Sequence, residues 1–234
     1  MKAATGGLSG ISLVRPSRLG DEVTRVLRRK ILLGELPAGR TTQEELANLL
    51  AVSVTPVREA LLRLETEGFI ERSPNKSVTI TAITAKDLAD IYELHAQISG
   101  MITRHACENV TRELLEHLHS RLFQESSEQL AAHDRVEFME QISWQFHRDI
   151  NVAADSPKLL QAMRFSLRYI PYGFYALFDD WPQKSNEDHL RILETLIEGD
   201  PDASQAAAIA HVRGAGQLLL EYFTTVGYWK LSDS

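Results

Sequence analysis

Residues 44–68, EELANLLAVSVTPVREALLRLETEG, constrain the fold of this chain more than any other stretch. The first half carries apolar residues at helical spacing, namely Leu46, Ala47, Leu49 and Leu50. The second half repeats them three and four residues apart, which gives one buried stripe made of Val57, Ala60, Leu61 and Leu64. Residues 51–54 separate the halves, so the pattern predicts two short helices joined by a tight turn.

The opposite face of the second predicted helix carries polar and basic residues. Thr55, Arg58 and Arg63 point away from the apolar stripe, and Ser53 directly precedes the helix. Hydroxyl groups and an arginine near the start of a short second helix are what a helix-turn-helix places in the major groove of DNA. The alternative is a plain packing unit without a nucleic-acid partner.

A β-hairpin is predicted directly after these helices. Residues 69–72 open a short strand with apolar Phe69 and Ile70. Residues 73–77 form a turn rich in Pro, Asn and Ser, and 78–81 are β-branched residues of a return strand. An upstream helix ends at Gly34. Residues 15–83 are therefore predicted to form a winged helix-turn-helix domain after a flexible N-terminus at 1–14. The candidate DNA contacts are Ser53, Thr55, Arg58, Arg63, Asn75 and Lys76.

Residues 31–77, ILLGELPAGRTTQEELANLLAVSVTPVREALLRLETEGFIERSPNKS, resemble the DNA-binding domain of the GntR family of bacterial transcription regulators. The most specific piece is 55–61, TPVREAL. This chain has Ala51 where the family usually has Gly and Val54 where it usually has Arg. In the family that arginine helps to grip the operator, so the second departure concerns DNA affinity and not the fold.

Charge distinguishes the N-terminal part of the chain, residues 1–85 (the head), from the remainder (the body). Residues 1–85 carry 12 basic and 9 acidic residues, whereas the remainder carries 13 basic and 23 acidic residues. A weakly basic head on an acidic body suits a protein whose head alone meets nucleic acid. The single cysteine, Cys107, excludes an intrachain disulfide, and neither a signal peptide nor a membrane helix is expected, so we expect a cytoplasmic protein.

The body is predicted to be an all-α antiparallel bundle of about six or seven helices over residues 84–230. We expect a bend at Pro171 and Gly173, and an interruption of the last helix at Gly214 and Gly216. The predicted helix starts are polar residues that can cap a first turn, namely Thr84, Thr111, Asp134, Ser156, Ser185 and Asp200.

The body also resembles the FCD ligand-binding domain of the FadR-like branch of this family. The pieces that carry the resemblance are Asp87-Leu88, Ile91–Leu94, Phe146-His147, Ser156–Leu159, Asp188-His189 and His211. The resemblance implies a small effector, most often an organic acid. His95 stands where the family usually has Arg, so it becomes a candidate effector contact, and Arg168 is another.

Three histidines lie in apolar stripes of three separate predicted helices. They are His147, His189 and His211, and helices of a bundle can converge such residues on one point. Imidazole suits Zn or Ni, and metal-binding FCD domains hold histidine at these positions. Those domains usually add an Asp one turn before the first histidine, where this chain has Ser143, also a candidate effector contact. The alternative is an effector pocket of neutral imidazoles without metal.

A metal-dependent enzyme is the competing class, since three histidines around a metal can activate water. However, no acid or base is evident beside His147, and the sequence has no phosphate loop and no nucleophile elbow. A DNA-binding protein with a purely structural body is a third possibility. The sequence favours a homodimeric transcription regulator, not an enzyme, that binds operator DNA and a small carboxylate effector.

Overall fold

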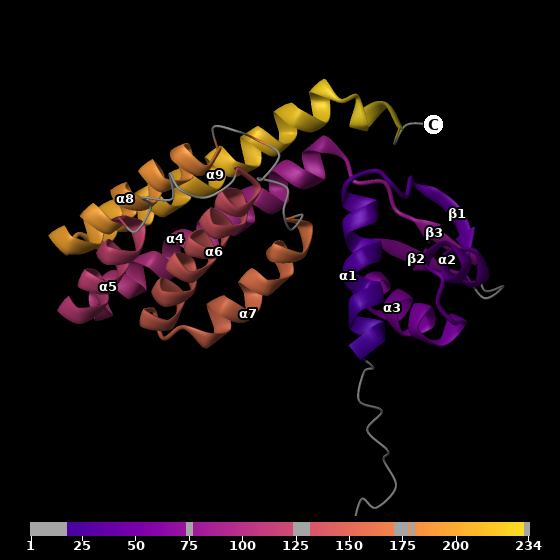
Figure 1. The fold of residues 1–234 in the computed structure, drawn as a ribbon, viewed down its shortest axis with the longest axis horizontal. Coiled ribbons are helices and arrows are strands. Elements are labelled where there is room, and N and C mark those ends of the chain that lie inside the picture. Colours follow the sequence, from indigo (N-terminus) through magenta and orange to yellow (C-terminus); the bar gives the residue numbers. More distant parts are fainter. Residues whose placement is uncertain (1–17, 74–76, 124–131, 171–177, 179–180, 232–234) are drawn as a thin grey trace, which may run out of the picture. The chain divides into compact units, whose positions relative to one another are not determined.

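The computed structural model describes residues 18–73, 77–123, 132–170, 178 and 181–231 (Figure 1). This part of the chain forms nine α-helices and one three-stranded antiparallel sheet, which confirms a mainly α protein with a small β wing. The chain divides into two compact units, one of Met1–Arg28 with Gly39–Thr81 and one of Arg29–Ala38 with Ala82–Ser234. None of the described helices is long and apolar enough to span a membrane.

The first unit contains three helices and the sheet. The helices are α1 (Arg18–Leu32, whose last residues belong to the second unit), α2 (Gln43–Leu50) and α3 (Val54–Thr66). The strands are β1 (Gly39–Thr42), β2 (Ile70–Arg72) and β3 (Ser77–Ile80), in the order β1-β3-β2. We expected the hairpin but not β1, because its four residues include no apolar side chain to indicate a strand.

The turn between α2 and α3 depends on a left-handed residue. Thr42 caps α2 with a capping box that includes Glu45, and Ala51 ends the helix at a φ of 54°. A non-glycine residue in this region crowds its own Cβ, which gives a physical reason for the glycine usual there in the family. After the turn, α3 places Val57, Leu61 and Leu64 in the core, each 0–1% exposed.

Two ion pairs connect α1 to α3 within this unit. The guanidinium of Arg28 donates to both carboxylate oxygens of Glu67, at 2.7–2.9 Å, and Glu67 is only 7% exposed. Arg63 on α3 pairs with Asp21 on α1. A bidentate, mostly buried pair fixes geometry more strongly than an exposed one, so Arg28–Glu67 holds the orientation of α1 against the end of α3.

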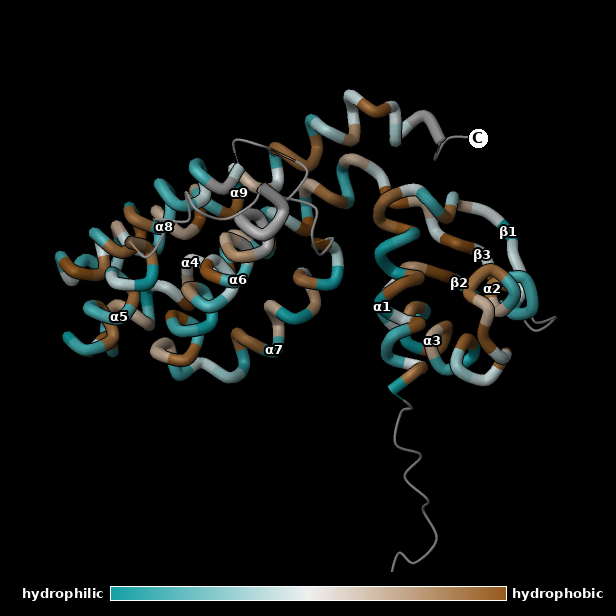
Figure 2. Tube along the Cα trace, in the orientation of Figure 1, coloured by the Kyte–Doolittle hydropathy of each residue, from teal (hydrophilic) through white to brown (hydrophobic). Residues whose placement is uncertain are grey.

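The second unit is a helical bundle. Its elements are α4 (Ala85–Asn109), α5 (Arg112–Phe123), α6 (Ala132–Ala153), α7 (Pro157–Ser166), η2 (Leu167–Tyr169), α8 (Trp181–Glu198), α9 (Pro201–Thr225) and η4 (Tyr228–Leu231). Hydrophobic and hydrophilic residues alternate along these helices (Figure 2), as amphipathic packing requires. The resulting core includes Ile102, Leu118, Phe146, Ile192 and Leu196.

The predicted helix starts had mixed outcomes. Thr84 and Asp200 are confirmed as N-caps, with side chains that accept from backbone N–H groups of the first turn. The start at Ser185 is wrong: α8 begins at Trp181, because Pro182 suits a first turn and Ser185 is buried inside the helix at 5% exposure. The bend expected at Pro171 and Gly173 lies outside the described residues.

Helix α9 runs without a break through Gly214 and Gly216, so the predicted interruption is wrong. Helices α4 and α9 pack closely, and the glycines of this contact have a packing role. A Cβ on Gly216 would lie 2.6 Å from the ring of Tyr92, and a Cβ on Gly100 would lie 2.6 Å from Ile209. A missing side chain at each position therefore allows the two longest helices to approach.

We expect Gly216→Ala to destabilise the protein by about 1–3 kcal/mol, because its methyl group would overlap the base of the Tyr92 side chain. Gly214→Ala is the matched control, since the nearest atom to its Cβ, Lys184 Cε, lies 3.9 Å away. That variant should gain about 0.5–1 kcal/mol from helix propensity. Denaturant unfolding measures both changes, and equal stabilities for the two variants would contradict this account.

Candidate functional site

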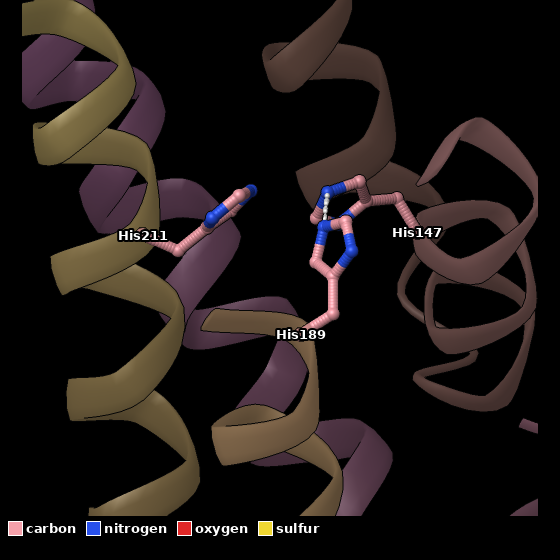
Figure 3. Close-up of side chains that lie close together, drawn as sticks. All are labelled: His147, His189 and His211. Atoms are coloured by element: carbon pink, nitrogen blue, oxygen red, sulfur yellow. Dashed lines mark hydrogen bonds between the residues drawn. The ribbon is translucent and has the colours of Figure 1, made fainter. Parts of the chain in front are cut away.

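Three imidazole rings from three helices meet inside the second unit (Figure 3). His147 comes from α6, His189 from α8 and His211 from α9. The Nε2 atoms of His147 and His189 lie 3.1 Å apart, and one ring nitrogen from each of the three residues lies within 4.8 Å of the others. The structure thus brings together the three histidines that the sequence singled out.

The rings are buried against an apolar wall. His189 is 2% exposed, His211 is 6% exposed, and the ring of the fully buried Phe146 lies 4.6 Å from that of His189. Burial lowers the pKa of His147 to about 3 and the pKa of His189 well below its usual 6.5, and the nearby His211 lowers both further. Both rings are therefore neutral at physiological pH, which is the form that binds a transition metal.

A carboxylate orients the third ring. Nδ1 of His211 lies 3.4 Å from Oδ2 of Asp188, and this hydrogen bond is the largest cause of the lowered pKa of Asp188. With Nδ1 engaged by Asp188, Nε2 is the nitrogen of His211 that remains to bind a metal. Metal-ligating histidines commonly have such a partner. Sequence reasoning missed this role of Asp188, although its place directly before His189 was visible.

The donor set and its spacing fit a divalent metal. Two nitrogens that each bind one ion at about 2.0–2.1 Å lie roughly 2.9–3.4 Å apart at octahedral to tetrahedral angles. The 3.1 Å between His147 and His189 falls in this range, and the third ring needs only a small approach. Three neutral imidazoles would leave coordination positions open for a further ligand.

The other candidate effector contacts lie on different elements. Ser143 is half-buried on α6, one turn before His147. His95 is buried on α4, where its Nδ1 lies 2.8 Å from Oγ of Ser166 on α7. Arg168 is partly buried in η2. Sequence reasoning missed Ser166, because a serine within an amphipathic helix gives no signal of its own.

In the first unit, three of the candidate DNA contacts cluster at the start of α3. Ser53 is the N-cap residue and makes no side-chain capping bond, and Thr55 and Arg58 are also exposed. Arg63 differs, because its pair with Asp21 gives it a role within the unit. Asn75 and Lys76 lie outside the described residues.

A winged helix-turn-helix with an exposed recognition helix, joined to a helical unit with a buried polar site, defines a ligand-responsive DNA-binding regulator. Residues 19–80 match the family described as "Bacterial regulatory proteins, gntR family", and residues 90–214 match the FCD domain. The chain therefore belongs to the GntR family of transcription regulators, with a GntR DNA-binding domain and an FCD effector-binding domain.

Named relatives agree with this assignment. The chain is 32% identical over 204 residues to the Nta operon transcriptional regulator of Aminobacter aminovorans, covering 85% of this chain and 94% of the relative. It is 28% identical over 196 residues to a probable D-xylose utilization operon transcriptional repressor of Paenarthrobacter nicotinovorans, covering 83% and 85%. The solved structure of E. coli McbR/YncC has the same fold, with a TM-score of 0.63 at 22% identity, covering 88% and 99%.

The buried histidines predict how stability depends on pH. The folded-state pKa lies below 6.5 for His95, His147 and His189. Between pH 6.5 and about 4, these histidines are therefore protonated in the unfolded chain but not in the folded protein. Their contribution to the free energy of unfolding is therefore fully present above pH 6.5 and is lost as the pH falls below it. Each histidine contributes up to about 1.4 kcal/mol per pH unit.

Denaturant unfolding of chelator-treated protein from about pH 7 to about pH 5 measures this slope. The variant His189→Gln provides the control, because removal of one of the three groups should make the slope shallower. Stability that does not change across this interval would show that the imidazoles are not buried in their neutral form.

Proposed function

We propose that this regulator responds to an organic acid that binds in the FCD domain beside a divalent metal, Zn or Ni, held by His147, His189 and His211. The convergence of three imidazole rings, of which His147 and His189 are neutral at physiological pH, carries the proposal. A bound dication would accept carboxylate oxygens at its open coordination positions. The acid would in turn reduce the positive charge that the bundle encloses.

The operator is bound by a homodimer in this proposal, with one half-site for each α3 helix. Leu94 and Met101 support a dimer, because these apolar residues lie seven positions apart on α4 and are 44% and 41% exposed. Effector binding changes operator affinity through a coupling free energy, typically about 1–3 kcal/mol. The protein acts in the cytoplasm and catalyses no reaction.

One observation favours a second version of this function. The hydrogen bond between Nε2 of His147 and Nε2 of His189 gives one nitrogen of each ring a partner without an ion. A site of this kind could bind the acid directly through imidazole N–H groups. Metal analysis of the purified protein, followed by acid binding with and without chelator, separates the two versions.

Arg58→Ala should weaken operator binding by about 1–3 kcal/mol, because the exposed guanidinium one turn into α3 is placed to contact a guanine edge or a phosphate. Fluorescence anisotropy at fixed salt measures the affinity, on an operator selected from a random duplex library. Arg112→Ala removes the same charge from an exposed position on α5 and should leave affinity unchanged. Equal affinities for both variants would refute the assignment of α3.

Ser143→Asp should raise metal affinity on the order of tenfold or more, because a carboxylate one turn before His147 lies on the same helix face and adds a negative ligand. His189→Ala should lower metal affinity by removing a ligand. Metal content by mass spectrometry and metal-dependent thermal stability report both changes. Ser143→Asn is the neutral control of similar size, and an Asp variant that behaves like the Asn variant would contradict a metal at this site.

A further inference from the structure

The hydrogen bonds of His95 fix which of its ring nitrogens carries the proton. Oγ of Ser166 lies 2.9 Å from the backbone oxygen of Met163 and 2.8 Å from Nδ1 of His95. A carbonyl oxygen only accepts, so the single hydroxyl proton of Ser166 goes to Met163. Both bonds form only if Nδ1 of His95 donates to Ser166. Nε2 of His95 is then an unprotonated acceptor.

The burial of Ser166 and His95 stabilises these two hydrogen bonds. Ser166 is 0% exposed and His95 is 8% exposed, so water does not compete for these bonds. Burial, followed by the charge of His211, also lowers the pKa of His95 to about 4. The ring is therefore neutral at physiological pH, and the lone pair on Nε2 is available to a ligand.

The packing of α4 against α9 places His95 level with His211. Tyr92 on α4 meets Gly216 on α9, and Gly100 on α4 meets Ile209 on α9. His95 lies between the two α4 positions, and His211 lies between the two α9 positions. The electrostatic effects of His211 on His95 and of His95 on His147 fit the same placement.

Nε2 of His95 has no hydrogen-bond partner in the described part of the chain, where Ser166, which bonds to Nδ1, is the only partner of this residue. An acceptor without a partner, on a side chain that is 8% exposed, favours a ligand that donates. A carboxylate oxygen cannot donate, and a cationic ammonium would be repelled by a dication at the neighbouring histidines. A neutral hydroxyl group meets both conditions.

We propose that His95 selects hydroxycarboxylates: the carboxylate of the effector binds at the three histidines, and a hydroxyl group of the same molecule donates to Nε2 of His95. The inference rests on the proposed function, since it assigns the chemical class of that effector. A site built to bond a hydroxyl group discriminates strongly against the analogue that lacks it.

The protonation of His95 can be observed directly. Long-range proton–nitrogen correlation spectra of ¹⁵N-histidine-labelled protein distinguish the two neutral tautomers, and His95→Leu identifies the signal. We expect Nδ1 protonated and Nε2 unprotonated in the full-length protein. Ser166→Ala should weaken the preference for the Nδ1-protonated tautomer, because it removes the hydroxyl acceptor and leaves His95 in place. A proton on Nε2 in the unaltered protein would overturn the inference.

Matched acids test the selectivity. Calorimetric titrations of metal-loaded, full-length protein with malate against succinate, glycolate against acetate, and 3-hydroxybutyrate against butyrate compare pairs that differ by one hydroxyl group. We expect at least one hydroxy acid to bind about tenfold or more tightly than its partner. In His95→Leu that ratio should approach one.

The outcomes separate the two proposals. Acids that bind and change operator affinity without any preference for the hydroxyl group overturn the role of His95 and leave the proposed function intact. A preference that survives in His95→Leu also overturns it. Failure of every acid to bind overturns the proposed function and, with it, the assigned effector class. If His95→Leu does not fold, Ser166→Ala carries the same comparison, with a reduced ratio expected.

Discussion

The close contact between α4 and α9 is the constraint on which the second unit, the helical bundle, depends. Gly100 and Gly216 leave room for Ile209 and Tyr92, so the two 25-residue helices fix each other's register. That register sets His95 level with His211. Helices held farther apart by side chains would lose both the packing and the shared polar site, because backbone separation decides which residues of facing helices meet.

The interior built by this packing tolerates polar groups because each ring is neutral or oriented. His147 and His189 bond to each other, His211 is held by Asp188, and His95 is held by Ser166. A charged imidazolium would be costly in such surroundings. Burial therefore keeps His95, His147 and His189 unprotonated, and this leaves their free nitrogens able to bind a metal or to accept a hydrogen bond.

The DNA-binding unit was largely visible in the sequence because its signals are local. The apolar spacing of 44–68, the tight turn and the β-branched return strand each depend on a few neighbouring residues. Strand β1 escaped prediction because its four polar residues gain strand geometry only by pairing with β3. The true start of α8 was missed for a similar reason, since a buried serine and a capping serine look alike in a sequence.

The sequence by itself determined the two domains' fold class, the exposed face of the recognition helix and the three histidines, because periodicity and residue type record which faces are buried. Only the tertiary structure showed that α9 continues through its glycines and that Asp188 orients His211. It also showed that Ser166 determines which ring nitrogen of His95 carries the proton. These facts join residues that are 23 and 71 positions apart. Only the packing of helices in three dimensions brings such groups within hydrogen-bond distance.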